Sequence, residues 1–170
     1  TDSNVGNIPL AEGKVLSTVH AYVETDDAAA AEQEIRERLQ ELQAKGAVVI
    51  VASESFGVDD PANEEYVVRL AREMKLYATG GHEVSQLYGL RVRTRTAVIN
   101  GSLIPRMMET ADMTETCVKN SGIGAPLMIM RCDGGVMTVD EVRRRPILTM
   151  LSGLAAGVAV LRAPAGLGRQ

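Results

Sequence analysis

The sequence is poor in aromatic residues and has no tryptophan. Only four tyrosines and one phenylalanine occur among its 170 residues, an aromatic share of 3%. Packing must therefore rest on Leu, Val, Ile, Ala and the eight methionines. The hydrophobic share of 45% and the charged share of 24% are ordinary for a globular protein, so the chain can bury one sizeable core or two small ones.

Net charge, cysteine and long apolar runs are also limited. A net charge of −4 and a pI near 5.3 provide no overall positive field for nucleic acid or an anionic membrane. The two cysteines, Cys117 and Cys132, predict neither a disulfide framework nor a metal site. They favour a reducing, cytoplasmic compartment, and we expect Cys117 in the core. No apolar run approaches the ~18 residues of a membrane span.

The two ends of the sequence differ from its middle. The first residue is Thr1, and residues 1–13 are polar with one proline, so we expect a linker or a fragment boundary there. We expect residues 163–170 to be a truncated tail. The missing initiator methionine and the Gly-rich end together suggest a piece excised from a larger protein.

Strand and helix patterns alternate in the first half of the chain. Strands are predicted at residues 15–23, 47–52 and 76–84, the last one interrupted by two glycines. Amphipathic helices are predicted at residues 25–45 and 59–75. The continuous apolar run at 47–52 is typical of a buried parallel strand. This half therefore predicts an α/β fold with parallel strands and flanking helices.

The second half has a different pattern. Residues 94–120 predict one long helix, or two joined ones, with a kink at Pro105. A buried strand is predicted at 126–131, and a short helix at 139–144 that stops before Pro146. A helix of small residues follows Ser152.

One candidate ligand-binding turn contains Asp133, Gly134 and Gly135. A turn at the carboxyl end of a parallel strand is where α/β folds bind ligands, and glycines allow the backbone to approach closely. Asp133 could accept a hydrogen bond from a hydroxyl or from a metal-bound water. In an equally favoured alternative, Asp133 bonds its own backbone in a tight turn.

A second candidate is the helix start at Ser152, Gly153 and Gly157. Its free N–H groups could bind an anion such as phosphate. The alternative is close helix packing through Gly153, Ala156 and Gly157. The pattern is neither a Walker A loop nor a dinucleotide fingerprint, because the required lysine and glycines are absent.

Arginines alternate at positions 91, 93 and 95. Arginine suits two-point recognition of carboxylate or phosphate, although we favour solvated or interfacial ion pairs here. We expect His20 to be structural and His82 to pair with Glu83. Cys132 lacks the histidine partner that a thiol nucleophile needs.

Four segments together resemble motifs of the hydantoinase A/5-oxoprolinase family, which includes the β subunits of acetone and acetophenone carboxylases. Residues 60–64 resemble the Asn-Pro-x-His-Glu motif, and residues 92–105 resemble the Glu-Arg-Thr motif with its following Asn-Ala and proline. Residues 131–137 resemble Gln-Ser-Asn-Gly-Gly-Val-Met. Residues 145–158 resemble Arg-Pro-x-x-Thr-Leu-Leu-Ser-Gly-Pro-Ala-Ala-Gly-Val. The resemblance extends from about residue 13 to residue 162.

The resemblance implies an ATPase fold of the actin and sugar-kinase (ribonuclease H-like) type. Residues 14–92 would end the family's N-terminal domain, and residues 93–162 would begin its hydantoinase A domain. The full-length protein would use ATP and magnesium to phosphorylate the carbonyl oxygen of a cyclic amide for hydrolysis, with a hydantoinase B-type partner subunit and neither nucleic acid nor membrane. Cleft residues would come from Arg93, Thr94, Asn100, Asp133, Gly134, Gly135, Ser152, Gly153 and Gly157.

The family's two Asp-x-Gly-Gly-Thr phosphate loops do not occur in the sequence. We therefore expect this part of the protein to bind no ATP and to be inactive alone. Departures from the motifs at Val92, at residues 131–133 and at Leu154 favour the ketone carboxylase branch as an alternative. Two further alternatives are a small-molecule-binding α/β domain and a non-catalytic interaction module that uses residues 91–95 and the methionines Met107, Met108 and Met113.

Overall fold

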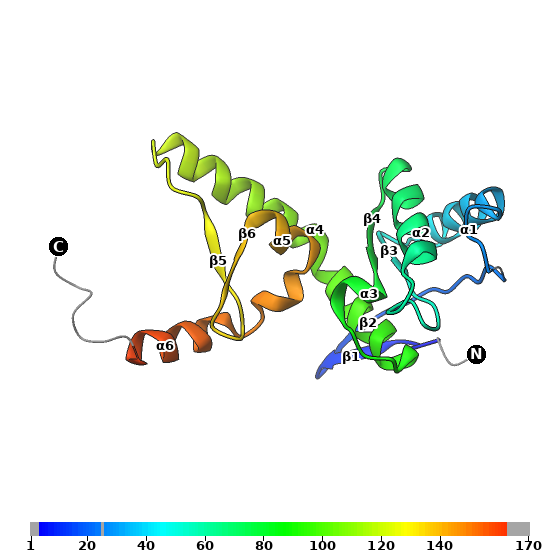
Figure 1. Cartoon of the computed structure of the whole chain (residues 1–170), viewed down its shortest axis with the longest axis horizontal. Helices are drawn as coiled ribbons and strands as arrows, with labels where there is room; N and C mark the ends of the chain where they lie inside the picture. The colour runs from blue at the N-terminus through cyan, green and yellow to red at the C-terminus, as the bar shows by residue number, and fades with distance from the viewer. Residues whose placement is uncertain (1–3, 25, 163–170) are drawn as a thin grey trace. The chain divides into compact units, whose positions relative to one another are not determined.

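The computed structural model describes residues 4–24 and 26–162, which form two compact units. The first unit ends at Pro105 and the second begins at Arg106. Helix α4 (Leu90–Asn120) begins in the first unit and ends in the second (Figure 1). The expected tail at 163–170 lies outside the described residues, and the expected domain boundary at 92/93 stays a prediction.

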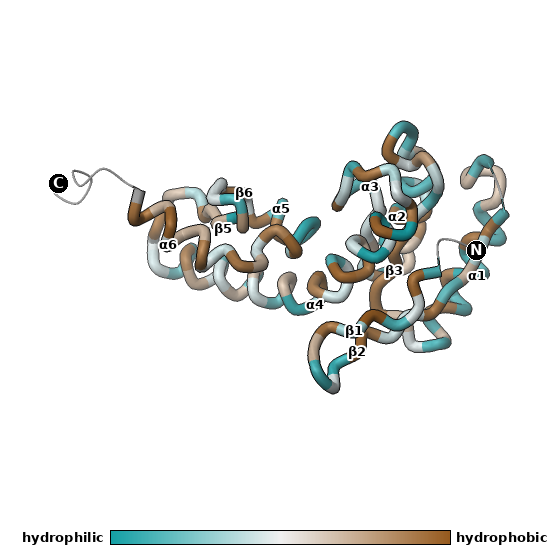
Figure 2. Tube along the Cα trace, turned by 90° about the horizontal axis from the view of Figure 1, so that it is seen from below, coloured by the Kyte–Doolittle hydropathy of each residue, from teal (hydrophilic) through white to brown (hydrophobic). Residues whose placement is uncertain are grey.

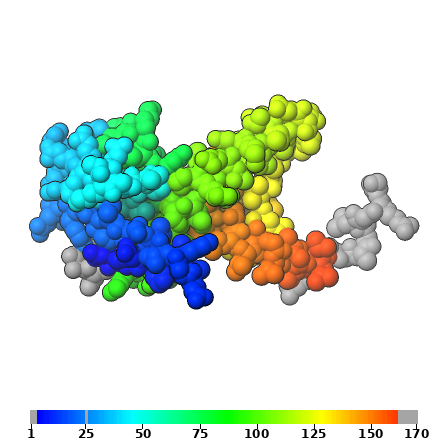
Figure 3. Space-filling view, turned by 180° about the vertical axis from the view of Figure 1, so that it is seen from behind, coloured from blue at the N-terminus to red at the C-terminus, as the bar shows by residue number. Residues whose placement is uncertain are grey.

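The first unit opens with an antiparallel hairpin of β1 (Ile8–Ala11) and β2 (Lys14–Leu16). Strand β1 lies within the stretch expected to be a linker. The hairpin covers the outside of the unit, in dark blue in Figure 3, and exposes Leu10 and Val15. The strand predicted at 15–23 ends at Leu16. Residues 17–24 continue without regular structure.

Helix α1 (Glu32–Ala44) is shorter than the predicted helix at 25–45. Asp27 Oδ1 accepts hydrogen bonds from the backbone N–H groups of Ala29 and Ala30, which form a turn ahead of the helix. Gly46 ends the helix with a φ of 89°, a conformation that glycine adopts without steric cost.

The centre of the first unit is a parallel pair of strands, β3 (Val49–Ala52) and β4 (Tyr77–Gly80), joined by helix α2 (Ala62–Glu73). The prediction of parallel α/β structure is confirmed. The core includes Ile35, Leu39, Ile50, Val68 and Leu70. In the parallel register Ala52 pairs with Gly80, so both strands end at the same carboxyl edge of the sheet. The short helix α3 (Gly81–Val84) follows β4 there.

Helix α4 approaches β3 closely at Gly101. A Cβ atom at Gly101 would lie 3.2 Å from Val49 Cγ1 and 3.2 Å from Val51 Cγ2. Those distances are tighter than normal contact, so the absence of a side chain allows the helix to lie against the strand. This packing places the first turns of α4 at the carboxyl edge of β3.

The second unit contains an antiparallel hairpin of β5 (Met128–Met130) and β6 (Val136–Thr138). A strand occurs within the predicted range 126–131, but the expectation that it is buried is wrong, since Met128 is exposed. Helix α5 (Val139–Arg144) matches the prediction and is capped by the Thr138 hydroxyl, which accepts from the N–H of Glu141. The 3₁₀ turn η1 (Pro146–Thr149) and α6 (Ser152–Arg162) complete the unit.

Arg143 on α5 forms ion pairs with the second half of α4. Its guanidinium lies 2.6 Å from Asp112, 2.6 Å from Glu115 and 2.8 Å from Asp140. The hydrogen bonds to Glu115 and Asp112 raise the pKa of Arg143. Helix α6 carries exposed apolar residues, brown in Figure 2: Leu154, Val158 and Leu161. Among the described residues, we find no helix both long and apolar enough to span a bilayer.

Candidate functional site

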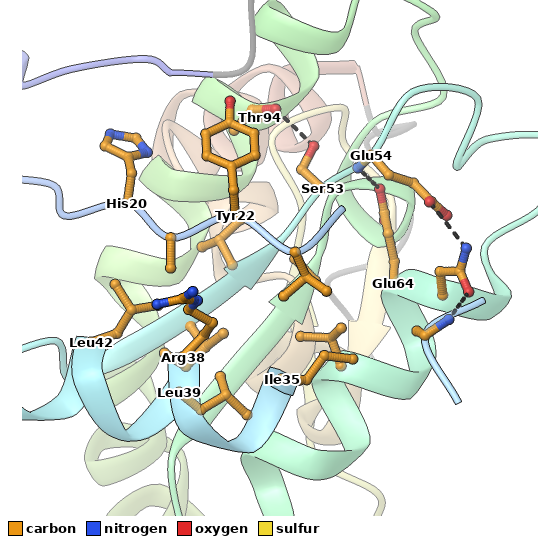
Figure 4. Close-up of a pocket in the computed structure, with 18 residues that line it drawn as sticks. His20, Tyr22, Ile35, Arg38, Leu39, Leu42, Ser53, Glu54, Glu64 and Thr94 are labelled. Atoms are coloured by element: carbon orange, nitrogen blue, oxygen red, sulfur yellow. Dashed lines mark hydrogen bonds between the residues drawn. The ribbon is translucent and has the colours of Figure 1, made fainter. Parts of the chain in front are cut away.

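Polar side chains from four elements converge at the carboxyl ends of β3 and β4. In open α/β sheets this edge is where ligands bind, because loops there surround a crevice. Figure 4 shows part of the arrangement. The residues are Ser53 and Glu54 after β3, Glu64 on α2, His82 after β4, and Arg93 and Thr94 on α4.

Glu64 is the centre of this cluster and is only 2% exposed. Its Oε1 accepts from the backbone N–H of Glu54 at 3.0 Å, and its Oε2 accepts from that of His82 at 2.8 Å. Oε2 also lies 2.7 Å from His82 Nδ1. Because a carboxylate accepts hydrogen bonds, the ring donates from Nδ1. One buried carboxylate thus binds the loops that follow both strands.

Two glycines make room for this pair. A Cβ atom at Gly57 would lie 2.5 Å from Glu64 Oε1, and one at Gly80 would lie 2.7 Å from His82 Cε1. Real Cβ atoms do not approach other atoms so closely. Any larger residue at these positions would therefore displace Glu64 or His82.

Arg93 is fully buried at the start of α4. Its Nη1 donates to the carbonyl oxygens of Leu87 and Tyr88, at 2.8 and 3.3 Å, and its Nη2 donates to that of Glu54. Its Nε has no hydrogen-bond partner among the described atoms. The solvated interpretation of the arginine run is thus wrong for Arg93, although Arg91 and Arg95 are exposed.

Thr94, the neighbour of Arg93, contacts the end of β3. Its hydroxyl donates to the carbonyl oxygen of Leu90 at 2.8 Å and lies 2.7 Å from Ser53 Oγ. Since the Thr94 proton is already used, Ser53 is the donor between the two hydroxyls. The lone pairs of Ser53 Oγ then remain as acceptors. Asn100, further along α4, is also fully buried.

A cavity of about 230 Å³ lies beside this cluster (Figure 4). Its walls come from residues 20–23, from α1 and from β3. Apolar side chains such as Ile35, Leu39 and Leu42 line most of it. Polar groups come from His20, Tyr22, Arg38, Ser53, Glu54, Asn63, Glu64 and Thr94.

Burial raises the pKa of Glu54, and the nearby carboxylates of Glu64 and Asp60 raise it further, against the hydrogen bond from Asn63. A raised pKa means that the folded state binds this proton more readily than the unfolded state. The stability that the proton contributes is therefore complete below the unfolded pKa and is lost as pH rises through the folded pKa.

Glu54→Gln is expected to remove this part of the pH dependence, because glutamine keeps the shape but does not ionise. Between pH 4 and pH 7 the free energy of unfolding should fall more in the wild type than in the variant. The difference should be below about 1 kcal/mol, since solvent screens a half-exposed carboxyl. Urea titrations across this range measure it, with exposed Glu65→Gln as the control for a lost charge. Identical pH profiles for wild type and Glu54→Gln would contradict the assignment.

The structure corrects the pairing expected for His82. His82 pairs with Glu64, whereas Glu83 accepts from the Thr79 hydroxyl and from the N–H of Gly80, both at 3.1 Å. The sequence did contain a signal for Glu64: it lies on the same stripe of α2 as buried Val68. A carboxylate on an apolar stripe indicates a buried polar partner.

The turn at Asp133, Gly134 and Gly135 lies in the second unit, between β5 and β6. Because this pair is antiparallel, the expectation of a parallel strand end is wrong. Asp133 Oδ1 accepts from the N–H of Gly135 at 2.9 Å, so the tight-turn alternative is confirmed. That bond and, to a smaller extent, the Arg131 guanidinium lower the pKa of Asp133.

Ser152, Gly153 and Gly157 lie on α6. A Cβ atom at Gly153 or Gly157 would meet no described atom within 4 Å, so the close packing considered for these glycines does not occur among the described residues. Cys117 is exposed, contrary to the expected core position, and so is Cys132. No group of acidic, histidine and cysteine side chains suited to a metal ion occurs within residues 4–24 and 26–162.

The geometry defines an α/β protein with a polar cluster at the carboxyl edge of its parallel strands. Residues 93–167 match the family model described as hydantoinase/oxoprolinase, so this region of the chain is similar to that family. The resemblance derived from the motifs is confirmed. An uncharacterized protein of Methanocaldococcus jannaschii is 24% identical over 128 residues, which are 74% of this chain and 19% of that protein.

Two solved structures share the fold. The ATP-dependent caprolactamase of Pseudomonas jessenii matches with a TM-score of 0.66 and 21% identity over 92% of this chain and 22% of that chain. Nucleotide-free acetone carboxylase matches with a TM-score of 0.61 and 24% identity over 75% of this chain and 18% of that chain. The chain therefore spans about a fifth of the length of these relatives, and the expected α/β fold with parallel strands is confirmed.

Proposed function

We propose that this chain forms a central part of an ATP-dependent enzyme that activates the carbonyl of a cyclic amide, a lactam or hydantoin, by phosphorylation for hydrolysis. The observation that carries the proposal is the hydantoinase/oxoprolinase match over residues 93–167. The likeness of the fold to an enzyme described as an ATP-dependent caprolactamase supports it.

The chemistry explains the need for ATP. An amide carbonyl is a poor electrophile, and transfer of a phosphoryl group to its oxygen converts that oxygen into a leaving group. The residues described here do not fit a nucleotide site, since neither phosphate loop occurs in the sequence. We therefore assign ATP and magnesium to the full-length protein, together with a hydantoinase B-type partner subunit. The role of this region is to support the cleft and to contact the substrate.

A ketone carboxylase is the second candidate. The likeness to acetone carboxylase and the sequence departures at Val92 and Leu154 favour it. Both reactions begin with activation of a carbonyl compound. The two candidates can be distinguished by the compound that stimulates phosphate release.

The full-length gene product with its co-purified partner provides the test. Lactams or hydantoins are expected to stimulate phosphate release from ATP by at least tenfold. Ring-opened product should form in proportion to the phosphate released. Stimulation by acetone and bicarbonate, without ring opening, would instead establish the carboxylase. Titration calorimetry on the 170-residue chain should show no ATP-Mg binding in the micromolar range. Micromolar binding with turnover would overturn the assignment of the nucleotide site to other regions.

A further inference from the structure

We propose that the cavity between residues 20–23, α1 and β3 binds the ring of a small, neutral cyclic amide. The choice of an amide rests on the proposed function, whereas the location and the recognition chemistry come from the cavity itself.

The cavity has the size of a small ring. An engineered apolar cavity of about 150 Å³ in another protein binds benzene, a six-membered ring. The volume here, about 230 Å³, is larger and accommodates a ring of six or seven members with a polar substituent. It is smaller than the roughly 300–1,000 Å³ of sites for drug-sized ligands. A ligand the size of acetone would leave most of it unfilled.

The walls suit the apolar part of such a ring. Ile35, Leu39 and Leu42 project from α1 on one side, as Figure 4 shows, and Ile50 and Ala52 belong to the facing strand β3. Burial of methylene groups against these side chains contributes about 25 cal/mol per Å² of apolar surface.

The polar groups suit a neutral amide. Ser53 Oγ donates to Thr94 and retains lone pairs that can accept a hydrogen bond from an amide N–H. Glu54 follows directly, and its carboxyl, when protonated, can donate to a carbonyl oxygen. The Glu64 carboxylate opposes an anionic ligand through like charge, and Arg38, which also lines the cavity, is already paired with Glu34 and Glu41.

The test is an NMR titration of ε-caprolactam into the methyl-labelled 170-residue chain. Binding in the roughly millimolar range, with shifts of the Leu39, Leu42 and Ile50 methyl groups, is expected for a ligand of this size. Cyclohexanecarboxylate, an anionic ring of similar size, should bind at least tenfold more weakly. Equal affinity for the two probes, or shifts confined to other methyl groups, would overturn the proposal.

Two variants locate the site. Leu42→Phe enlarges a wall residue and should weaken binding at least tenfold, whereas Val48→Phe, at an exposed position outside the cavity, should leave it unchanged. Ser53→Ala removes one hydrogen-bond partner and should weaken binding roughly 2- to 10-fold. Ser53→Ala also provides the test of the site if Leu42→Phe fails to fold. Unchanged affinity in Ser53→Ala and in folded Leu42→Phe would overturn the proposal.

A failure of the cavity assignment can be distinguished from a failure of the proposed function. In the full-length enzyme, Leu42→Phe should raise the KM for a lactam at least tenfold, whereas Val48→Phe, outside the cavity, should leave both the KM and substrate-independent ATP hydrolysis unchanged. Lactam-stimulated phosphate release with an unchanged KM in Leu42→Phe would refute the cavity assignment alone. Absence of lactam-stimulated phosphate release in the wild type would refute the proposed function, while caprolactam binding to the chain would still report on the cavity.

Discussion

Replacement of Arg93 by alanine is expected to lower the free energy of unfolding of the first unit by roughly 3–5 kcal/mol. The guanidinium is fully buried and donates to three backbone carbonyl oxygens, those of Glu54, Leu87 and Tyr88. Its loss would leave these acceptors without partners and a cavity at the start of α4. Urea denaturation followed by circular dichroism measures the change.

The control for this prediction lies two residues away. Arg95 is exposed, and Arg95→Ala should change the free energy of unfolding by no more than about 0.5 kcal/mol. Similar effects of the two substitutions would mean that the buried hydrogen bonds of Arg93 do not stabilise the unit.

Glu64→Ala is the second substitution with a large expected effect, again roughly 3–5 kcal/mol of unfolding free energy. The variant would lose three hydrogen bonds, from the N–H groups of Glu54 and His82 and from the His82 ring. The buried N–H groups of Glu54 and His82 would then lack a hydrogen-bond partner, and their burial would destabilise the folded state. Thermal and urea unfolding of the purified variant measure the loss.

Glu65 offers a matched comparison on the same helix. Its side chain is 66% exposed and lies 3.7 Å from His82 Nε2. Glu65→Ala removes the same chemical group but should cost no more than about 0.5 kcal/mol. A further readout is the His82 ring, whose NMR signals should shift in Glu64→Ala and stay nearly unchanged in Glu65→Ala. The opposite pattern would contradict the role given to Glu64.

Arg93 and Glu64 act on the same backbone segment. Glu64 accepts from the N–H of Glu54, and Arg93 donates to the carbonyl oxygen of that residue. The loop after β3 is therefore held from two elements, α2 and α4. This loop also provides the polar groups of the cavity, so the stability of the cluster and the geometry of the proposed binding site depend on each other.

Local sequence patterns were sufficient for much of the fold. The apolar run at 47–52, the amphipathic pattern of α2 and the charged pattern of α5 each predicted an element that the structure contains. The motifs also predicted a resemblance to the hydantoinase/oxoprolinase family, and the match over residues 93–167 supports that resemblance. These features depend on residues close together in the chain, and the pattern of apolar and polar side chains determines them directly.

Pairings between residues far apart in the sequence could be identified only from the structure. The apolar stripe of α2 indicates a buried partner for Glu64, but no local pattern identifies His82 as that partner in preference to pairing His82 with Glu83. Only the parallel register of β3 and β4 brings α2 to the end of β4. Likewise, the apolar residues at 128–130 fit a parallel or an antiparallel strand equally, and the pairing with β6 decided between them.

By itself the sequence determined the alternation of helices and strands and the resemblance to a family, because both are expressed in the order and spacing of residues along the chain. The tertiary structure alone decided which polar groups are buried together. Arg93 and Arg95 carry the same side chain two positions apart, and the sequence treats them alike. Their different roles arise because one side of α4 faces the carboxyl edge of the strands, where carbonyl oxygens need donors, while Arg95 lies in solvent.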